Sequence, residues 1–238
     1  MKKHFEDPEN KHVPIYVVAW RAIRDKALSV SVATWYNYAR ILGYSRHALS
    51  YRRPRRHGIR AAKPGEIVHA DVTIFRPRDN TRVYIYIIID NFLRKILGWH
   101  ASMSAHAGEF ISTLENAFTC FIKPKLHAGE QSILMVDDGS ESNNETVQHF
   151  LDGTHGALRK LVAQKDIIFS NSMIEAFNKV LKYRHLFHHD IPDYNGVVKH
   201  LNGFIHEYNS RPHCAHQFGR TPDEVFDGKN PPITDIAG

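Results

Sequence analysis

The chain has 238 residues and a net charge of +6, and 42% of its residues are hydrophobic, which is enough to build a core. It contains no apolar run of membrane-spanning length, so no transmembrane helix is expected, and its polar N-terminus shows no signal-peptide pattern. Its two cysteines, Cys120 and Cys214, form no metal-binding pair, which is typical of a reducing cytoplasm without disulfides.

The positive charge is concentrated at the N-terminus. Residues 1–63 hold 14 Lys and Arg against 4 Asp and Glu, a net charge of +10, whereas residues 64–238 hold 17 against 21, a net charge of −4. A basic head on a mildly acidic body indicates a polyanion-binding module joined to a domain with its own carboxylate chemistry.

Residues 1–50 are predicted to form a helical, DNA-binding head. Helices are expected over residues 14–26 and 32–42, and Ser31 can cap the second. Two short helices across a tight turn are compatible with a helix-turn-helix, and a helical hairpin that packs on the main domain is the alternative. The basic charge favours DNA binding. The candidate DNA-contacting side chains on the second helix include Asn37 and Arg40.

Residues 51–63 are predicted to form a basic linker arm. Pro54 and Gly58 argue against a helix, so the segment is expected to be extended. A solvated linker is one explanation, but so many arginines in a short stretch favour an arm that follows DNA phosphates. The arginines in question are Arg52, Arg53, Arg55, Arg56 and Arg60.

The body is predicted to be a mixed α/β sheet covered by helices. Three strands with short connections imply an antiparallel meander, and helices and strands alternate after it, which is typical of a sheet covered on both faces. Residues 64–190 would form this catalytic core, and residues 191–238 a C-terminal helical extension. The expected strands are 66–76, 82–89, 95–102, 132–136 and 158–163, and the expected helices are 108–120, 146–151, 171–182 and 196–208, with a capping box at Thr221 and Glu224.

Three acidic residues lie on separate elements of this body. Asp71 interrupts an apolar strand, where an unpaired carboxylate is costly, and Asp137 lies just past a strand end, where open α/β sheets tend to place ligands. Glu175 shares a helix face with Lys179 and Lys182. If the acids converge, hard divalent cations would neutralise their repulsion. Two Mg²⁺ ions would then clamp the attacking and leaving oxygens of a phosphodiester.

Each acid also has a structural explanation. Asp71 would make a hydrogen bond at a strand end, and Asp137 would form a turn. Glu175 would belong to a surface ion-pair ladder with its two lysines. The spacing of the three acids alone does not decide between these roles and a metal site.

Four ordered motifs resemble one known family. Residues 69–73 (HADVT), 136–141 (VDDGSE) and 170–178 (SNSMIEAFN) resemble the three signature blocks of the D-D-E transposases and retroviral-type integrases. Residues 208–213 (YNSRPH), followed by 221–226 (TPDEVF), are similar to the C-terminal end of the integrase core in bacterial insertion-sequence transposases. Four motifs in the right order are more specific than any one of them.

The resemblance covers about residues 64–228 and implies an RNase H-like fold and DNA strand transfer with Mg²⁺ or Mn²⁺. It implies that Asp71, Asp137 and Glu175 hold the metal ions, and that Lys179 and Lys182 contact DNA near the reacting end. The partners it implies are double-stranded DNA, as element ends and target, and further copies of the chain in a homo-oligomer on that DNA. The implied location is the bacterial cytoplasm, in association with the nucleoid.

Asp138 stands where the family usually has Asn, and we assign the ligand role to Asp137 because it directly follows the strand. Asp90 matches a noncatalytic Asp of the strand hairpin and is expected to be structural. Arg211 would either reach DNA or pin the C-terminal segment to the core. No His-His-Cys-Cys zinc module of the retroviral kind is present in the sequence.

The chain also holds 17 histidines, some of them grouped like metal ligands. A zinc site is one explanation, although a structural site requires four ligands with pairs from two elements. Solvated histidines near a DNA surface are the explanation that we favour. The two groups are His185, His188 and His189, and the segment 213–216.

Two other functions remain as alternatives to a transposase. The first is a metal-dependent nuclease that cuts DNA without joining it. The second is a noncatalytic DNA-binding remnant of a transposase, against which the intact set of three acids argues.

Overall fold

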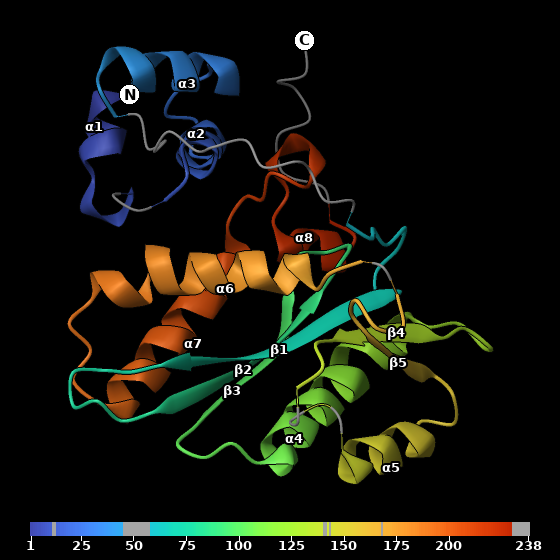
Figure 1. The fold of residues 1–238 in the computed structure, drawn as a ribbon. Helices are drawn as coiled ribbons and strands as arrows, with labels where there is room; N and C mark the ends of the chain where they lie inside the picture. The colour runs from blue at the N-terminus through green and yellow to red at the C-terminus, as the bar shows by residue number, and fades with distance from the viewer. Residues whose placement is uncertain (11–12, 45–57, 140–141, 143, 168, 230–238) are drawn as a thin grey trace. The chain divides into compact units, whose positions relative to one another are not determined.

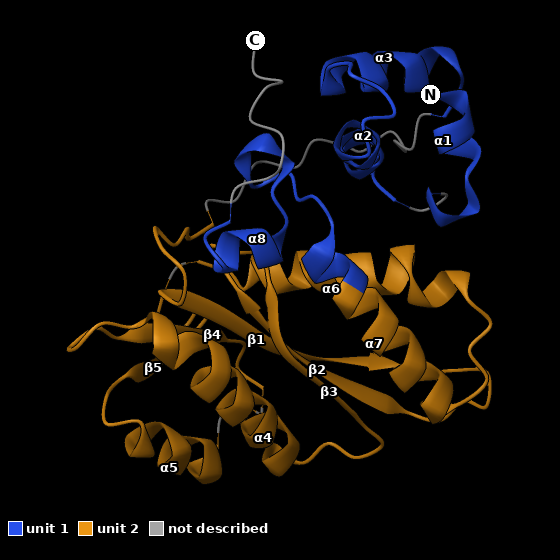
Figure 2. Ribbon diagram, turned by 180° about the vertical axis from the view of Figure 1, so that it is seen from behind, with its two compact units in different colours: residues 1–56, 207–238 blue, residues 57–206 orange. Residues whose placement is uncertain are grey.

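The computed structural model describes residues 1–10, 13–44, 58–139, 142, 144–167 and 169–229. The chain divides into two compact units, one of residues 57–206 and one that combines residues 1–56 with 207–238 (Figure 2). No helix within the described ranges has the length and apolar character needed to cross a bilayer.

The larger unit is built on a five-stranded sheet with the order β3-β2-β1-β4-β5 (Figure 1). Its first three strands form an antiparallel meander, and β4 and β5 continue the sheet in parallel with β1. The predicted mixed sheet is therefore confirmed. The strands are β1 (Ile67–Phe75), β2 (Val83–Asp90), β3 (Ile96–Ser102), β4 (Ser132–Val136) and β5 (Leu158–Val162).

Side chains alternate across β1, which gives its two faces different roles. Val68 and Ala70 join the core cluster that α4 and α5 cover, while His69 and Asp71 point to the opposite face, under α6. Figure 1 shows α4 and α5 on one face of the sheet and α6 and α7 on the other. These helices are α4 (Ala107–Ala117), α5 (Glu145–Gly153), α6 (Ser172–Arg184) and α7 (Tyr194–Ser210).

Local sequence signals start several helices at the predicted positions. The Ser31 hydroxyl accepts a hydrogen bond from the Thr34 backbone N–H, at 3.3 Å. Asp193 accepts from the Gly196 N–H at 2.8 Å and so caps α7, which begins two residues before the predicted position. The predicted capping box at Thr221 is also present. The helix expected over residues 108–120 is α4, which passes into a π-helical turn at Phe118–Ile122.

The smaller unit contains a helical head with its own core. Trp35 is fully buried at its centre, and Phe5 packs edge-on against it with ring centroids 5.4 Å apart. Both predicted helices of the head are confirmed, while their use as a helix-turn-helix stays a prediction. The head helices are α1 (Lys2–Glu6), α2 (Ile15–Arg24) and α3 (Val32–Ile41).

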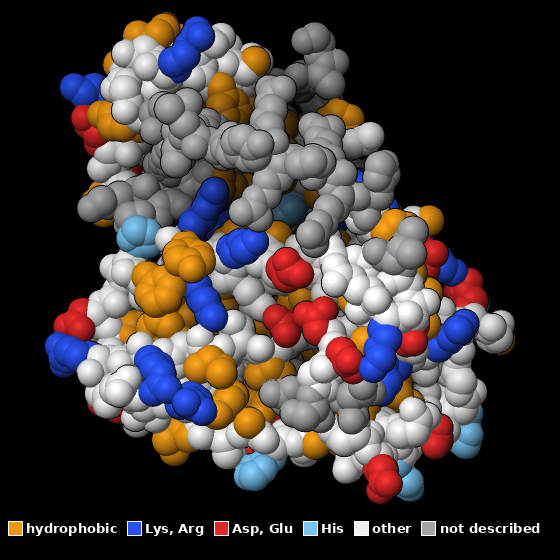
Figure 3. All heavy atoms as spheres, viewed as in Figure 1, with side chains coloured by type: hydrophobic (Ala, Val, Ile, Leu, Met, Phe, Trp, Pro, Cys, Tyr) orange, Lys and Arg blue, Asp and Glu red, His pale blue; other side chains and the backbone are white. Residues whose placement is uncertain are grey.

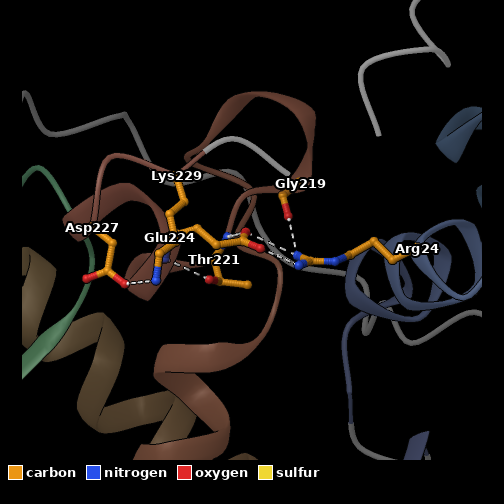
Figure 4. A network of polar contacts seen from close by, with 6 residues as sticks. All are labelled: Arg24, Gly219, Thr221, Glu224, Asp227 and Lys229. Atoms are coloured by element: carbon orange, nitrogen blue, oxygen red, sulfur yellow. Dashed lines mark hydrogen bonds and ion pairs between the residues drawn. The ribbon is translucent and has the colours of Figure 1, made fainter. Parts of the chain in front are cut away.

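The C-terminal segment belongs to the same compact unit as the head. Arg24 of α2 forms a two-pronged ion pair with Glu224 of α8 (Pro222–Phe226), and it also donates to the Gly219 carbonyl oxygen at 3.4 Å (Figure 4). Glu224 is the acid that closes the Thr221 capping box. The Glu224 carboxylate therefore both caps the N-terminus of α8 and links that helix to α2.

The close approach of Gly219 to Trp20 gives a testable stability prediction. Gly219 has φ +64°, and a Cβ there would overlap the Trp20 ring. Gly219→Ala is therefore expected to lower the free energy of unfolding by about 2–4 kcal/mol, because clash and backbone strain add. Gly228 is the matched control, since it has φ +69° with nothing within 4 Å. Urea unfolding of both variants measures the difference, and equal losses would contradict the contact with Trp20.

Candidate active site

The two aspartates meet because β1 and β4 are neighbouring parallel strands. Their register pairs Val68 with Leu134 and His69 with Met135. Two residues further along each strand direction, this register places Asp71 beside Asp137, which lies just past the carboxyl end of β4. A pocket of about 50 Å³ lies there, lined by both aspartates with Ala70, Val72, Phe110, Gly139 and Ser142.

Glu175 reaches the same site from α6. A buried stripe that includes Ile174 and Phe177 packs the helix on the sheet and leaves Glu175 exposed in the first turn. Burial, together with the negative charges on Asp137 and Glu175, raises the pKa of Asp71 to about 6. Burial and then the charge on Glu175 also raise the pKa of Asp137. The three predicted acids therefore lie within electrostatic reach of one another, and Figure 3 shows acidic side chains gathered where α6 crosses the sheet.

The donor chemistry of this site fits a hard divalent cation. Three carboxylates offer the oxygen ligands that Mg²⁺ and Mn²⁺ prefer, and their mutual repulsion is the charge that such an ion would neutralise. The pocket beside the aspartates has room for a small ion with water ligands. Among the described residues, the one group of three possible ligands whose ligand atoms all lie within 4.8 Å of one another consists of histidines. The carboxylates of the acidic site are farther apart than that, so they would move closer together on binding an ion.

A buried polar network fastens the start of α6 to β1. The Nδ1 of His69 donates to Asn171 Oδ1 at 2.6 Å, and its Nε2 accepts from Asn91 Nδ2 at 2.8 Å. Burial lowers the pKa of His69 to about 4, so the ring is neutral and both contacts are satisfied. Asn171 Nδ2 donates to the Ala70 carbonyl oxygen at 3.2 Å, and a hydrogen bond from the same side chain lowers the pKa of Asp137. The network therefore spans all three elements that carry the acids.

Asn178 and Lys182 act on Asp71 directly. Asn178 Nδ2 donates to Asp71 Oδ2 at 2.7 Å, which fixes the orientation of that carboxylate. The positive charge of Lys182 lowers the pKa of Asp71, against the stronger effect of burial. The sequence motifs contain His69, Asn171 and Asn178, but the spacing of these residues along the chain gave no indication of the hydrogen bonds that they make.

The structure favours Asp137 over Asp138 as the second acid. Asp138 is exposed and pairs with Lys165 Nζ at 2.9 Å, whereas Asp137 lines the pocket with Asp71. Asp90 is buried and accepts from the Gly65 and Leu93 backbone N–H groups, each at 2.7 Å. These bonds are consistent with the structural role predicted for Asp90.

The predicted DNA-binding residues fall into three groups. Lys179 is exposed on α6, Lys182 is half-buried beside Asp71, and Asn37, Arg40 and Arg60 are exposed. Arg211 is 9% exposed, pairs with Glu207 at 3.1 Å and lies over the Tyr208 ring at 4.9 Å. These contacts hold Arg211 against the end of α7, and both predicted roles of Arg211, pinning the C-terminal segment to the core and contacting DNA, stay predictions. Arg52, Arg53, Arg55 and Arg56 lie outside the described residues.

The raised pKa of Asp71 predicts a pH-dependent effect on stability. The folded pKa of about 6 exceeds the ordinary 3.8, so the stability that this carboxyl group contributes is present below pH 3.8 and is lost as the pH rises through 6. Without divalent ions, Asp71→Asn is expected to stabilise the protein by about 1–3 kcal/mol near pH 7.5 and by little below about pH 4. Urea unfolding in EDTA at both pH values measures this, and a pH-independent difference would contradict it.

Comparison with known sequences agrees with this geometry. Residues 61–167 match the family model of the integrase core domain. The transposase for insertion sequence element IS904 of Lactococcus lactis is 29% identical over 143 residues, which cover 58% of this chain and 53% of that protein. The chain therefore spans about half the length of this curated relative.

Solved structures show the same fold. A chain of the simian T-cell lymphotropic virus intasome, solved in complex with PP2A regulatory subunit B56 gamma, aligns with a TM-score of 0.54 and 20% identity, over 88% of this chain and 70% of that one. The HTLV-2 integrase catalytic core domain, solved in complex with magnesium, aligns with a TM-score of 0.53 and 15% identity, over 70% of this chain and 99% of that one. The larger unit therefore has the RNase H-like fold of an integrase catalytic core, and residues 61–167 within it are similar to the integrase core domain family.

Proposed function

We propose that this protein is a DNA transposase that cuts the ends of a mobile element and joins them to target DNA in a metal-dependent reaction. The observation that supports this proposal is that Asp71 and Asp137 line one pocket of an integrase-type sheet, within electrostatic reach of Glu175. A family member that had lost catalysis would have no need to keep three repelling carboxylates together.

The three carboxylates would hold two Mg²⁺ or Mn²⁺ ions. Bound there, the ions would activate the attacking oxygen and neutralise the charge on the reacting phosphate. Asp71 lies within electrostatic reach of both other acids, so it would be one of the residues that hold the ions. Asn178 would hold its carboxylate in one orientation, and the network of His69 and Asn171 would keep Glu175 in place relative to it.

The reaction needs no nucleophilic side chain. In the cutting step, water attacks the phosphodiester at the element end and the 3′-oxygen leaves as a free hydroxyl. In the joining step, that 3′-hydroxyl attacks a target phosphodiester in line, and the displaced target oxygen leaves. The protein contributes position and charge, which supply most of the catalysis in phosphoryl transfer.

Basic residues would hold the DNA through its phosphates. Lys179 and Lys182 extend along α6 from Glu175, so they would contact the strand near the reacting phosphate. Joining two ends of one element requires at least two active sites, so we propose that a homo-oligomer assembles on the DNA. The further proposed contacts are Asn37, Arg40, Arg52, Arg53, Arg55, Arg56, Arg60 and Arg211. We place the reaction at the bacterial nucleoid, in the cytoplasm.

A strand-transfer assay tests the proposal. Pre-cut duplexes made from the DNA that borders the gene are incubated with the full chain, Mn²⁺ and a supercoiled plasmid. Plasmid molecules covalently joined to the duplex would support a transposase. Nicked plasmid without joined product would point to the nuclease, and DNA binding without either product would point to a noncatalytic remnant.

A further inference from the structure

Three histidines outside the acidic site form a compact cluster. His185 ends α6, His189 follows the short helix Leu186–His188, and His200 lies on α7. Each offers a ring nitrogen, and these three nitrogens all lie within 4.8 Å of one another. We propose that this three-histidine cluster binds one transition-metal ion of the zinc class. The inference goes beyond the proposed transposase activity and does not rest on it.

The spacing is close to what such an ion requires. Zinc binds imidazole nitrogen at about 2.0–2.1 Å, so two nitrogens in a tetrahedral site are about 3.3 Å apart. Small rotations of the side chains would bring the cluster to that separation. The rings already crowd together, with centroids 4.5 Å apart for His185 and His189, 4.5 Å for His189 and His200, and 5.3 Å for His185 and His200.

One ring is already held in the orientation of a metal ligand. The Nδ1 of His189 donates to the His185 backbone carbonyl oxygen at 2.8 Å. This bond places the proton on Nδ1 and leaves the Nε2 lone pair of His189 for a metal. Histidines that bind metals usually donate their second ring nitrogen to a carbonyl or carboxylate in this way.

The surroundings support the other two ligands. The His185 ring packs against the Phe204 ring, with centroids 4.7 Å apart, which restricts its motion. His200 is half-buried on α7, and its ring lies beside those of His185 and His189. His189 is exposed, which leaves a path for the ion and a place for a water ligand.

The donor set separates this cluster from the acidic site. Three imidazoles select zinc, copper, nickel or cobalt, whereas Mg²⁺ prefers carboxylate and water oxygens. An ion bound here would join the end of α6 to α7 and close the connection between them. Because α6 carries Glu175 at its other end, the ion would stabilise the helix on which the third acid lies.

The experiment uses the full chain without an affinity tag, in excess Mg²⁺ so that the acidic site is occupied. Bound zinc per chain is measured after dialysis, and Co²⁺ is titrated while the visible absorption of a nitrogen-ligated ion is followed. The test variant is His189→Gln/His200→Gln, because these changes spare the half-buried His185. The control is His188→Gln, an exposed neighbour outside the cluster.

We expect the wild type and the control to bind one zinc ion per chain and to unfold at a higher temperature with zinc. The double variant should lose the ion, with affinity lowered more than about a hundredfold, since even outer-shell changes cost about 10–100-fold. Both the zinc-dependent shift in unfolding temperature and the Co²⁺ spectrum should be lost with it. Equal zinc binding by the double variant, or no zinc binding by the folded wild type, would overturn the proposal.

Discussion

Glu175→Gln is expected to reduce DNA joining by about 10³-fold or more, because it removes one of the carboxylates that would hold the catalytic metal ions. Each 1.4 kcal/mol of lost transition-state stabilisation lowers the rate about tenfold. The change keeps the size of the side chain and removes its negative charge. Glu175 is exposed and lies outside the buried stripe of α6, so the fold should not suffer. The pKa of Asp71 and of Asp137 should both fall, because each is raised by the charge on Glu175.

The matched control for this variant is Glu145→Gln. Glu145 is likewise an exposed acid in the first turn of a helix of the same unit, but it belongs to α5. Joining and Mn²⁺-dependent nicking of plasmid DNA are measured for both variants, with circular dichroism as a check on folding. If Glu175→Gln and Glu145→Gln join DNA equally well, Glu175 has no part in catalysis.

Asn171→Ala is expected to lower joining by about a hundredfold and stability by about 2–4 kcal/mol. The change leaves the buried His69 Nδ1–H and the Ala70 carbonyl oxygen without the partners that Asn171 supplies. It also removes a hydrogen bond that lowers the pKa of Asp137. The pH midpoint of joining should therefore rise, which a loss of stability alone would not cause.

Asn144→Ala separates the two effects of that change. Asn144 also stands at the N-cap of a helix, and its side chain accepts from the Val147 N–H at 3.0 Å, but that helix carries none of the three acids. The Asn144→Ala variant should lose about 1 kcal/mol of stability and keep its joining activity at a temperature where it is folded. If Asn171→Ala behaved in the same way, the network would hold the fold without positioning the acids.

The strands and most helices could be predicted from local patterns because each pattern has a local cause. The run of β-branched residues in β2 and the cap at Ser31 need no partner elsewhere in the chain to be recognised. Asp71 and Asp137 could be singled out locally, because an acid in an apolar strand and one past a strand end are unusual, whereas Glu175 and the metal-binding role of all three were predicted from the resemblance to a known family. Their actual approach depends on the parallel register of β1 with β4, which local patterns do not fix.

The positioning contacts could not be predicted, because they join distant parts of the chain. His69 and Asn171 are separated by 102 positions, and Arg24 and Glu224 by 200. The third histidine of the cluster was missed for the same reason. His185 and His189 are close in sequence, whereas His200 joins them only because α7 packs back beside α6.

The most direct test of the acidic site is Mn²⁺ binding by calorimetry. Two proteins are compared, one with Asp71 and one with Asp71→Asn. Both also carry His189→Gln/His200→Gln, so that the three-histidine cluster cannot bind the ion. If Asp71, Asp137 and Glu175 hold the metal ions, the protein that retains Asp71 should bind Mn²⁺. The Asp71→Asn variant, which has an uncharged amide in place of the carboxylate, should not. Folded protein that retains Asp71 yet binds no Mn²⁺, even with DNA present, would contradict the account. The acids would then have no metal to hold, and the basic head would be the main functional site.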